Sequence, residues 1–95
     1  MNTPKIKILV VEDEAMIALD IKEKLTEMGY VVPMTIDNGT DAIRYAGEIR
    51  PDIMLMDIVI KGEMDGIEAA MQIKEKYNIP SLFLTAYNSG SIIDR

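Results

Sequence analysis

Apolar and polar positions follow two different periods along the chain, and together they predict four strands and three helices. Runs of consecutive apolar residues predict strands that are covered on both faces, as in the middle of a parallel sheet. Between these runs, apolar residues recur at the spacing of one helical turn, which is typical of amphipathic helices. The predicted strands cover residues 6–11, 30–35, 53–57 and 81–85.

The predicted helices have identifiable ends. Gly29 closes the first helix, because glycine suits the left-handed conformation that follows many helices. Asn38 supplies a side-chain cap for the second helix, with Asp41 as an acid in its first turn, and Pro51 prevents this helix from continuing. The third helix opens with a capping box at residues 65–68. The apolar stripes contain Ile17, Ile21, Leu25 and Met28 in the first helix, Ala42, Ile43, Ala46 and Ile49 in the second, and Ala70, Ile73 and Tyr77, with Met71 beside them, in the third.

Strands and helices alternate, and the connections between them are short. This order predicts an α/β domain with a parallel sheet, helices on both faces and right-handed crossovers. At 95 residues the chain is long enough for one such domain and too short for a second. Pro33 favours an edge position for the strand at residues 30–35, because proline cannot donate to a sheet ladder.

The composition narrows the classes of function. The 10 Lys and Arg against 16 Asp and Glu give a net charge of −6, so nucleic acid or an anionic membrane surface would repel the chain. The absence of Cys and His excludes disulfides, the usual zinc sites and histidine-based acid–base catalysis. With no long apolar segment in the sequence, we expect a cytoplasmic protein without a membrane anchor. Any metal site must use oxygen ligands.

Hydrogen-bonding side chains follow three of the predicted strands. Glu12 and Asp13 follow the first, Asp57 ends the third, and Thr85 ends the fourth. Each has an ordinary structural interpretation, since Asp13 can cap a helix, Asp57 can cap a turn and Thr85 can simply end a strand. In a parallel sheet, however, these strand ends meet at one edge, where ligands bind. Converging carboxylates repel one another unless a cation neutralises them, and such a set of hard oxygen ligands suits Mg²⁺.

Four motifs, in this order, make the sequence resemble the receiver domain of response regulators in two-component signalling. The motifs are Ile8-Leu9-Val10-Val11-Glu12-Asp13-Glu14, Asp52-Ile53-Met54-Leu55-Met56-Asp57, Met64-Asp65-Gly66-Ile67-Glu68 and Leu82-Phe83-Leu84-Thr85-Ala86. The resemblance runs from about Lys5 to the last residue. It implies a flavodoxin-like, doubly wound parallel sheet with strand order 2-1-3-4, in which the usual fifth strand and fifth helix are missing. Residues 1–95 would then form a single receiver domain that is incomplete at its C-terminus.

The resemblance also implies a chemistry. Asp57 would accept a phosphoryl group from a histidine kinase or a phosphotransfer domain, forming a mixed anhydride. The Thr85 hydroxyl and the Ala86 amide would each bond a phosphoryl oxygen. The expected ligands of Mg²⁺ are Glu12, Asp13, Asp57 and the backbone carbonyl of Val59. The resemblance therefore implies a phosphoacceptor signalling module and not a turnover enzyme. Phosphoryl transfer depends mostly on positioning and electrostatic stabilisation, which the expected residues would supply.

The sequence departs from the family pattern in two places. The lysine that usually ends the fifth strand is absent, and the segment from Asp57 to Asp65 is one residue longer than the commonest form. Lys61 in this segment is a candidate replacement for the missing cation, although a solvated loop lysine is the simpler interpretation. Without a fifth strand, residues 81–85 become an exposed apolar edge, and a homodimer through this edge, a fragment of a longer receiver and a natural remnant are three explanations left open.

The main alternative function is a phosphorylation-independent interaction domain that keeps the fold without the switch. A hydrolase with an aspartate nucleophile is disfavoured, because it would need a second acid at the position of Val59. A flavin-binding module of the same fold is disfavoured as well, since Glu12, Asp13 and Glu14 stand where it would bind a phosphate.

Overall fold

A computed structural model describes residues 5–84 as alternating strands and helices. The strands are β1 (Ile8–Val11), β2 (Thr35–Ile36), β3 (Ile53–Asp57) and β4 (Ser81–Leu84), and the helices are α1 (Ala15–Glu27), α2 (Gly39–Ile49) and α3 (Gly66–Tyr77). All pairs of neighbouring strands are parallel, in the order β2-β1-β3-β4. The predicted flavodoxin-like strand order is therefore confirmed. None of the helices in this part of the chain is long and apolar enough to cross a membrane.

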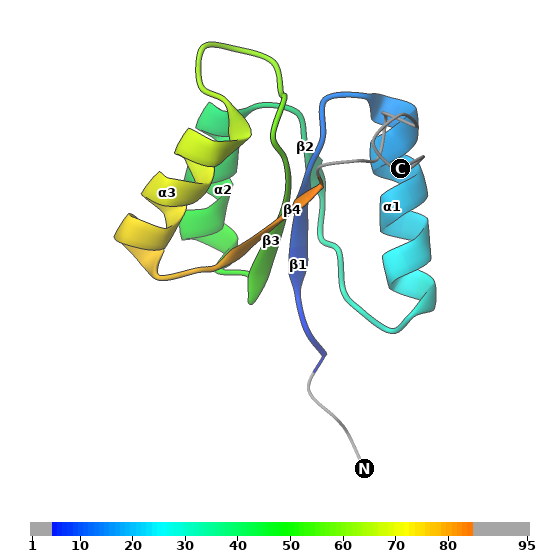
Figure 1. Ribbon diagram of the computed structural model, residues 1–95. Coiled ribbons are helices and arrows are strands. Elements are labelled where there is room, and N and C mark those ends of the chain that lie inside the picture. Colours follow the sequence, from blue (N-terminus) through cyan, green and yellow to red (C-terminus); the bar gives the residue numbers. More distant parts are fainter. Residues whose placement is uncertain (1–4, 85–95) are drawn as a thin grey trace, which may run out of the picture.

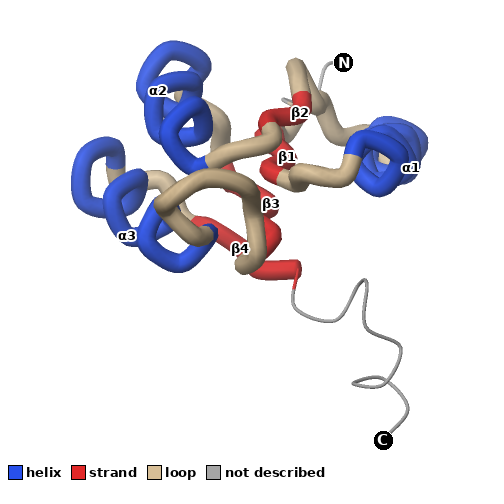
Figure 2. Tube along the Cα trace, turned by 90° about the horizontal axis from the view of Figure 1, so that it is seen from above, coloured by secondary structure: helices blue, strands red, loops and turns tan. Residues whose placement is uncertain are grey.

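The helices cover both faces of the sheet, as predicted. Helix α1 lies on one face, while α2 and α3 lie side by side on the other (Figures 1 and 2). Two clusters of buried residues fill these layers. The cluster under α2 and α3 includes Leu9, Val11, Met54, Met56 and Ile73, and the cluster under α1 includes Ile8, Val10, Ile21 and Val32. Successive residues of β1 thus point to opposite faces, and the whole strand is buried.

Strand β2 is much shorter than the predicted strand at residues 30–35. Val31 forms an isolated bridge with Lys7, and regular pairing with β1 resumes only at Thr35 and Ile36. Pro33 lies between these two points and has no N–H to donate, which accounts for the interruption. The predicted edge position of this segment is confirmed, because β2 is the outermost strand on its side of the sheet.

The end of the first helix also differs from the prediction. Met28 was expected in the apolar stripe, but α1 ends at Glu27 and the Met28 side chain is 68% exposed. Met28 takes the C-cap position, and Gly29 follows with a φ of 101°, the left-handed conformation expected of a glycine after a helix. Met71, predicted beside the stripe of α3, is exposed as well.

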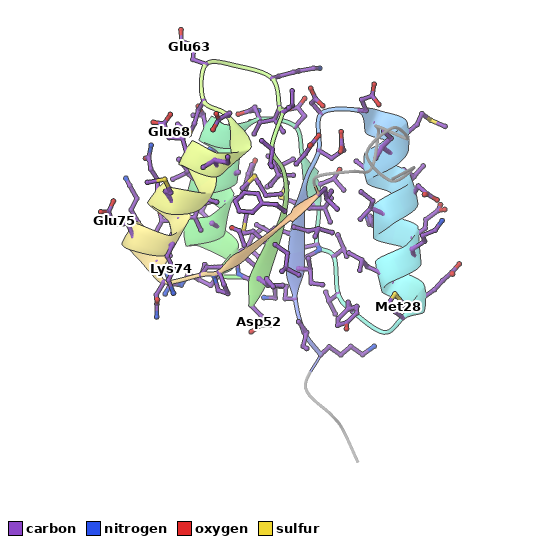
Figure 3. All side chains as sticks on the ribbon, in the orientation of Figure 1. Met28, Asp52, Glu63, Glu68, Lys74 and Glu75 are labelled. Carbon is purple, nitrogen blue, oxygen red and sulfur yellow. The ribbon has the colours of Figure 1, made fainter. Side chains whose placement is uncertain are left out.

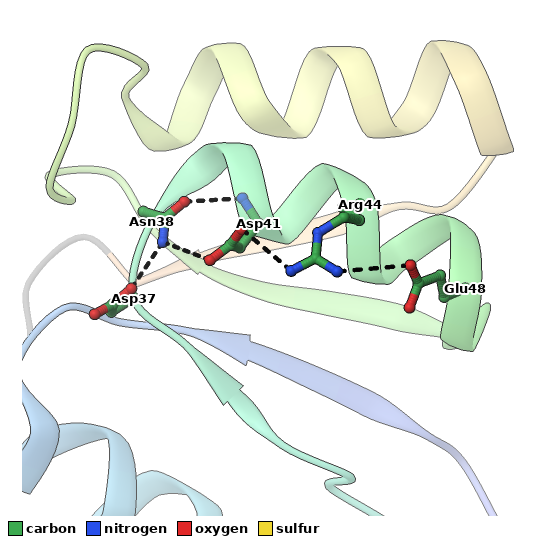
Figure 4. Close-up of polar contacts among 5 residues, drawn as sticks. All are labelled: Asp37, Asn38, Asp41, Arg44 and Glu48. Atoms are coloured by element: carbon green, nitrogen blue, oxygen red, sulfur yellow. Dashed lines mark hydrogen bonds and ion pairs between the residues drawn. The ribbon is translucent and has the colours of Figure 1, made fainter.

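The predicted caps of the other helices are present. The Asn38 side chain accepts a hydrogen bond of 2.8 Å from the Asp41 amide, and the Asp65 side chain accepts one of 2.9 Å from the Glu68 amide. The Asn38 side-chain amide also donates to the carboxylates of Asp37 and Asp41 (Figure 4). Arg44 then bridges Asp41 and Glu48 along the exposed side of α2. Asn38 therefore fixes the start of α2 and the turn that precedes it.

Replacing Asn38 with Ala should lower the free energy of unfolding by about 1 kcal/mol, the usual value of a side-chain N-cap. Chemical denaturation of the parent and the variant measures this difference. Asn38→Ser is the matched control, because serine keeps a cap oxygen but loses the amide that bonds Asp37 and Asp41. An equal loss in both variants would show that the contacts of the side-chain amide, rather than the cap, stabilise the turn.

Candidate functional site

The sheet register brings two acids to one edge. Strands β1 and β3 are parallel neighbours, and Val11 pairs with Met56. Glu12 directly follows Val11, and Asp57 directly follows Met56, so the two acids lie at the same level on adjacent strands. The Glu12 amide bonds the Ile36 carbonyl at 2.8 Å, which fixes the chain just beyond the end of β1. The predicted meeting of strand ends is therefore confirmed for these residues.

Asp13 joins these acids. One carboxylate oxygen from each of Glu12, Asp13 and Asp57 lies within 4.8 Å of the others. Glu12 and Asp57 are buried, with only 3% and 6% of their surfaces exposed, while Asp13 is half-buried. An oxygen-rich cluster of this size, open to solvent on the side of Asp13, has the ligands that a small divalent cation prefers.

The alternative interpretation of Asp13 as a helix cap is wrong. The N-cap of α1 is Glu14, and this helix start has no side-chain capping hydrogen bond. The interpretation of Asp57 as a turn residue is partly right, since its Oδ1 accepts a long hydrogen bond of 3.4 Å from the Val59 amide. That interaction leaves the rest of the carboxylate available to the cluster.

Burial perturbs the ionisation of Glu12. Desolvation is the largest influence and raises the pKa of this carboxyl from 4.5 to about 7. The Glu14 amide donates a hydrogen bond of 3.1 Å to Glu12 Oε2 and opposes the rise, whereas the negative charge of Asp57 adds to it. The cluster therefore resists full ionisation near neutral pH, and a bound cation would relieve both the desolvation and the repulsion. This donor set fits Mg²⁺.

Gly66 holds the segment after Asp57 in place. Its amide donates a hydrogen bond of 2.8 Å to the Ile58 carbonyl, which attaches the start of α3 to the end of β3. A Cβ at this position would collide with the Asp57 carbonyl oxygen and would lie 2.9 Å from the Ile58 Cα atom. Only glycine allows this close approach, so the path of the backbone beside the acids depends on Gly66.

A recess of about 440 Å³ opens beside the acids, and we call it the acid recess. Its lining includes Glu12, Asp13, Asp37, Asp41 and Lys61. Sequence reasoning missed Asp37 and Asp41 as part of this surface. Asp37 directly follows β2 at the same sheet edge, which was a usable indication, whereas Asp41 lies in α2. Lys61 lies on the recess, and its backbone forms a bridge with Asn38. Among residues 5–84, no ion pair joins Lys61 to a carboxylate. Its role as a replacement cation for a phosphoryl group stays a prediction.

The other predicted site residues are described only in part. Thr85 and Ala86 lie outside the described residues. Val59 is 74% exposed next to Asp57, and the proposed role of its carbonyl stays a prediction. At the end of β4, Leu84 pairs with Asp57, so the fourth strand reaches the same edge of the sheet as the acids.

The chain is similar to known signalling proteins over nearly its whole length. The family model of the response regulator receiver domain matches residues 8–95. The transcriptional regulatory protein YdfI of Bacillus subtilis is 39% identical over 92% of this chain and 41% of its own length. The transcriptional regulatory protein PdtaR of Mycobacterium tuberculosis is 35% identical over 94% of this chain and 43% of its own. The chain thus spans less than half the length of these relatives.

Solved structures agree with this similarity. The signal receiver domain of a modulated diguanylate cyclase from Desulfovibrio desulfuricans superimposes with a TM-score of 0.83 and 36% identity, over 95% of this chain and 72% of that one. The anti-anti-sigma factor PhyR of Bartonella quintana, in complex with the anti-sigma factor NepR, matches with a TM-score of 0.80 and 26% identity, over 92% of this chain and 36% of that one. The order of the strands and the acid cluster agree with these matches. The chain therefore belongs to the family of response regulator receiver domains.

Proposed function

We propose that Asp57 is the phosphoacceptor of this receiver domain and that Glu12, Asp13, Asp57 and the Val59 carbonyl hold Mg²⁺ beside it. The observation that carries the proposal is the convergence of carboxylates from the ends of two adjacent strands, around a buried glutamate whose pKa is raised to about 7. A bound Mg²⁺ would supply the positive charge that balances the transferring group and the acids.

In the proposed reaction a carboxylate oxygen of Asp57 attacks phosphorus, and the bond between phosphorus and the leaving group of the donor breaks. The electron pair of that bond leaves with the donor, which is a phosphohistidine of a kinase or phosphotransfer domain. Because the Val59 amide contacts Oδ1, we assign the attack to Oδ2. The Thr85 hydroxyl and the Ala86 amide would then bond the phosphoryl oxygens.

Receiver domains interact with kinases or with other partners, and this site has an apolar surface next to the acids. Val59 is 74% exposed just after the acceptor strand, and Met16 is 78% exposed in the first turn of α1. Both residues follow strand ends at the edge that carries the acids. We propose that a cytoplasmic kinase or phosphotransfer domain contacts these side chains while its phosphohistidine reaches Asp57.

The test is to incubate the chain with a small-molecule phosphodonor, with and without Mg²⁺, and to record its intact mass. We expect a single phosphoryl adduct that requires Mg²⁺ and is absent from Asp57→Asn. Asp52→Asn is the matched control, because Asp52 lies just before the opposite end of β3, where its carboxylate accepts a bond from the Lys7 amide. A folded parent without the adduct, or an adduct that persists in Asp57→Asn, would contradict the proposal. Circular dichroism of each variant checks that the protein is folded.

A second candidate function is that of an interaction domain that works without phosphorylation. It is favoured by the PhyR structure, because that protein is seen in complex with an anti-sigma factor. A folded parent that never forms the adduct is the result expected from this alternative.

A further inference from the structure

The loop between β3 and α3, residues 58–65, contains the Val59 carbonyl of the proposed metal site. It extends beyond the end of the sheet, with Glu63 at its outer end and Asp52 at the opposite end of β3 (Figures 1 and 3). Lys61 and Glu63 are both exposed. An exposed loop holds a backbone ligand in one place only if other parts of the molecule fix its path.

Residues on both sides of the Val59 carbonyl are attached to the rest of the fold. This carbonyl belongs to the peptide unit that joins Val59 to Ile60. Before this unit, the Gly66 amide donates a hydrogen bond of 2.8 Å to the Ile58 carbonyl. After it, the Ile60 side chain is only 8% exposed and belongs to the cluster of buried residues under α2 and α3. The orientation of the peptide unit therefore depends on attachments that lie on both of its sides.

The start of α2 provides the next attachment. Lys61 forms a parallel bridge with Asn38, the N-cap of this helix. Strand β1 lies between β2 and β3, so the bridge joins the segments that follow these two strands beyond the point where β1 ends. The Asn38 side chain is itself fixed by hydrogen bonds with the Asp41 amide and with the carboxylates of Asp37 and Asp41 (Figure 4). The bridge therefore attaches the loop to a well-fixed helix start.

Met64 makes a second contact between the loop and α2. A Cβ on Gly39 would lie 3.2 Å from the Met64 Sδ atom and 3.3 Å from its Cγ atom, so this side chain lies close to the Gly39 backbone. Met64 is half-buried and also packs against the cluster under α2 and α3. Gly39 directly follows Asn38, which forms the bridge with Lys61. Two adjacent residues of α2 and its cap therefore hold the loop at two points.

We propose that Met64 is a positioning residue for the metal site, because it holds the loop against α2 and thereby fixes the Val59 carbonyl. The inference rests on the proposed function, in which this carbonyl is a ligand of Mg²⁺. The Met64 thioether is a soft group that does not suit Mg²⁺, so its role is to hold the loop. Without this side chain, only the bridge would remain of the two contacts with α2. Metal binding would then have to order the loop, and its affinity would fall.

A Mg²⁺ titration followed by NMR tests this role without a phosphodonor. The Ile60 amide nitrogen shares a peptide unit with the Val59 carbonyl, so its chemical shift responds when a cation binds that oxygen. We expect the Kd for Mg²⁺ to be about tenfold higher in Met64→Ala than in the parent, as is usual when a residue that orients a ligand is lost. Met64→Leu should keep the Kd of the parent within about twofold, because leucine has nearly the same volume.

Tyr77→Leu is the matched control. A Cβ on Gly47 would lie 2.6 Å from the Tyr77 hydroxyl oxygen, so this ring packs onto a glycine of α2 as the Met64 side chain does. The Gly47 contact lies roughly 12 Å further along the helix. Tyr77→Leu disturbs the packing of α2 against α3 and should leave the Kd for Mg²⁺ unchanged. Equal increases in Tyr77→Leu and Met64→Ala would indicate general loosening of the fold and would overturn the inference.

The outcomes separate this inference from the proposed function. If Mg²⁺ left the Ile60 shift of the parent unchanged, the Val59 carbonyl would not be a ligand, and the inference would fail together with that part of the proposed function. If the parent responded and Met64→Ala had the same Kd, the inference alone would fail. Met64→Val also loses the Sδ contact with Gly39 and should raise the Kd in the same direction. It replaces Met64→Ala if circular dichroism shows that variant to be unfolded.

Discussion

Replacing Gly66 with Ala should lower the free energy of unfolding by about 3 kcal/mol, because the new methyl group meets backbone rather than a flexible side chain. The Cβ collides with the Asp57 carbonyl oxygen, and the hydrogen bond from the Gly66 amide to the Ile58 carbonyl prevents α3 from moving away freely. Relief of the collision must displace the end of β3 or the start of α3. Chemical denaturation measures the loss of stability.

Gly62→Ala is the matched control for this variant. Gly62 lies in the loop that leads to α3 and has a φ of 97°, but nothing lies within 4 Å of its Cβ position. The expected cost is about 1 kcal/mol, from the left-handed backbone alone. If Gly66→Ala cost no more than Gly62→Ala, the close approach at Asp57 would be easily relieved, and Gly66 would not fix the loop.

In metal-free buffer, the parent should lose stability relative to Glu12→Gln as the pH rises from about 4.5 to about 7. The folded protein holds the pKa of Glu12 above its unfolded value of 4.5, so this carboxyl favours folding only while it is protonated. The favourable state is fully present below the unfolded pKa and is lost as the pH passes the folded value of about 7. Since one pKa unit corresponds to about 1.4 kcal/mol, the difference between the two proteins should reach at most about 3.5 kcal/mol above neutral pH.

Thermal and chemical denaturation over a pH series checks this result, with Glu14→Gln as the control for removal of a nearby exposed carboxylate. Mg²⁺ should reduce the pH-dependent loss in the parent and have a smaller effect on Glu12→Gln, because the cation favours the charged carboxylate. Parallel pH profiles for the parent and Glu12→Gln would contradict the raised pKa. A Mg²⁺ response as large in Glu12→Gln as in the parent would show that Glu12 is not a metal ligand.

Local rules were sufficient for part of the fold. The caps at Asn38 and Asp65 were predicted correctly, because each depends on a residue and the amide three positions later. Strand β3 was predicted to its last residue, since a run of apolar residues ends there at an acid. The alternation of strands and helices predicts the parallel direction of the strands, which brings the ends of β1 and β3 to one edge and Glu12 close to Asp57.

The predictions were wrong or incomplete where contacts between distant parts of the chain determine the structure. A regular helical period cannot indicate that α1 ends before Met28 and leaves this residue exposed. A Val-rich segment does not indicate where Pro33 interrupts its pairing. Adjacent acids also differ in ways that sequence cannot show, because Glu12 is buried and Asp13 is half-buried. The acid recess also includes Asp41, which α2 brings there by packing against the sheet, and no local sequence pattern indicates this packing.

The order of the strands has a consequence for how the chain acquires its structure. The first strand, β1, lies between β2 and β3, and the hydrogen bond from the Lys7 amide to Asp52 closes a loop of 45 residues. During synthesis β1 therefore emerges long before the partner on its inner side, and its apolar residues stay uncovered on that side until β3 follows. Such non-local pairing is slow and exposes chains to aggregation. The acids at the ends of β1 and β3 come together only when this pairing is complete. The acid cluster therefore forms only after the centre of the sheet has folded.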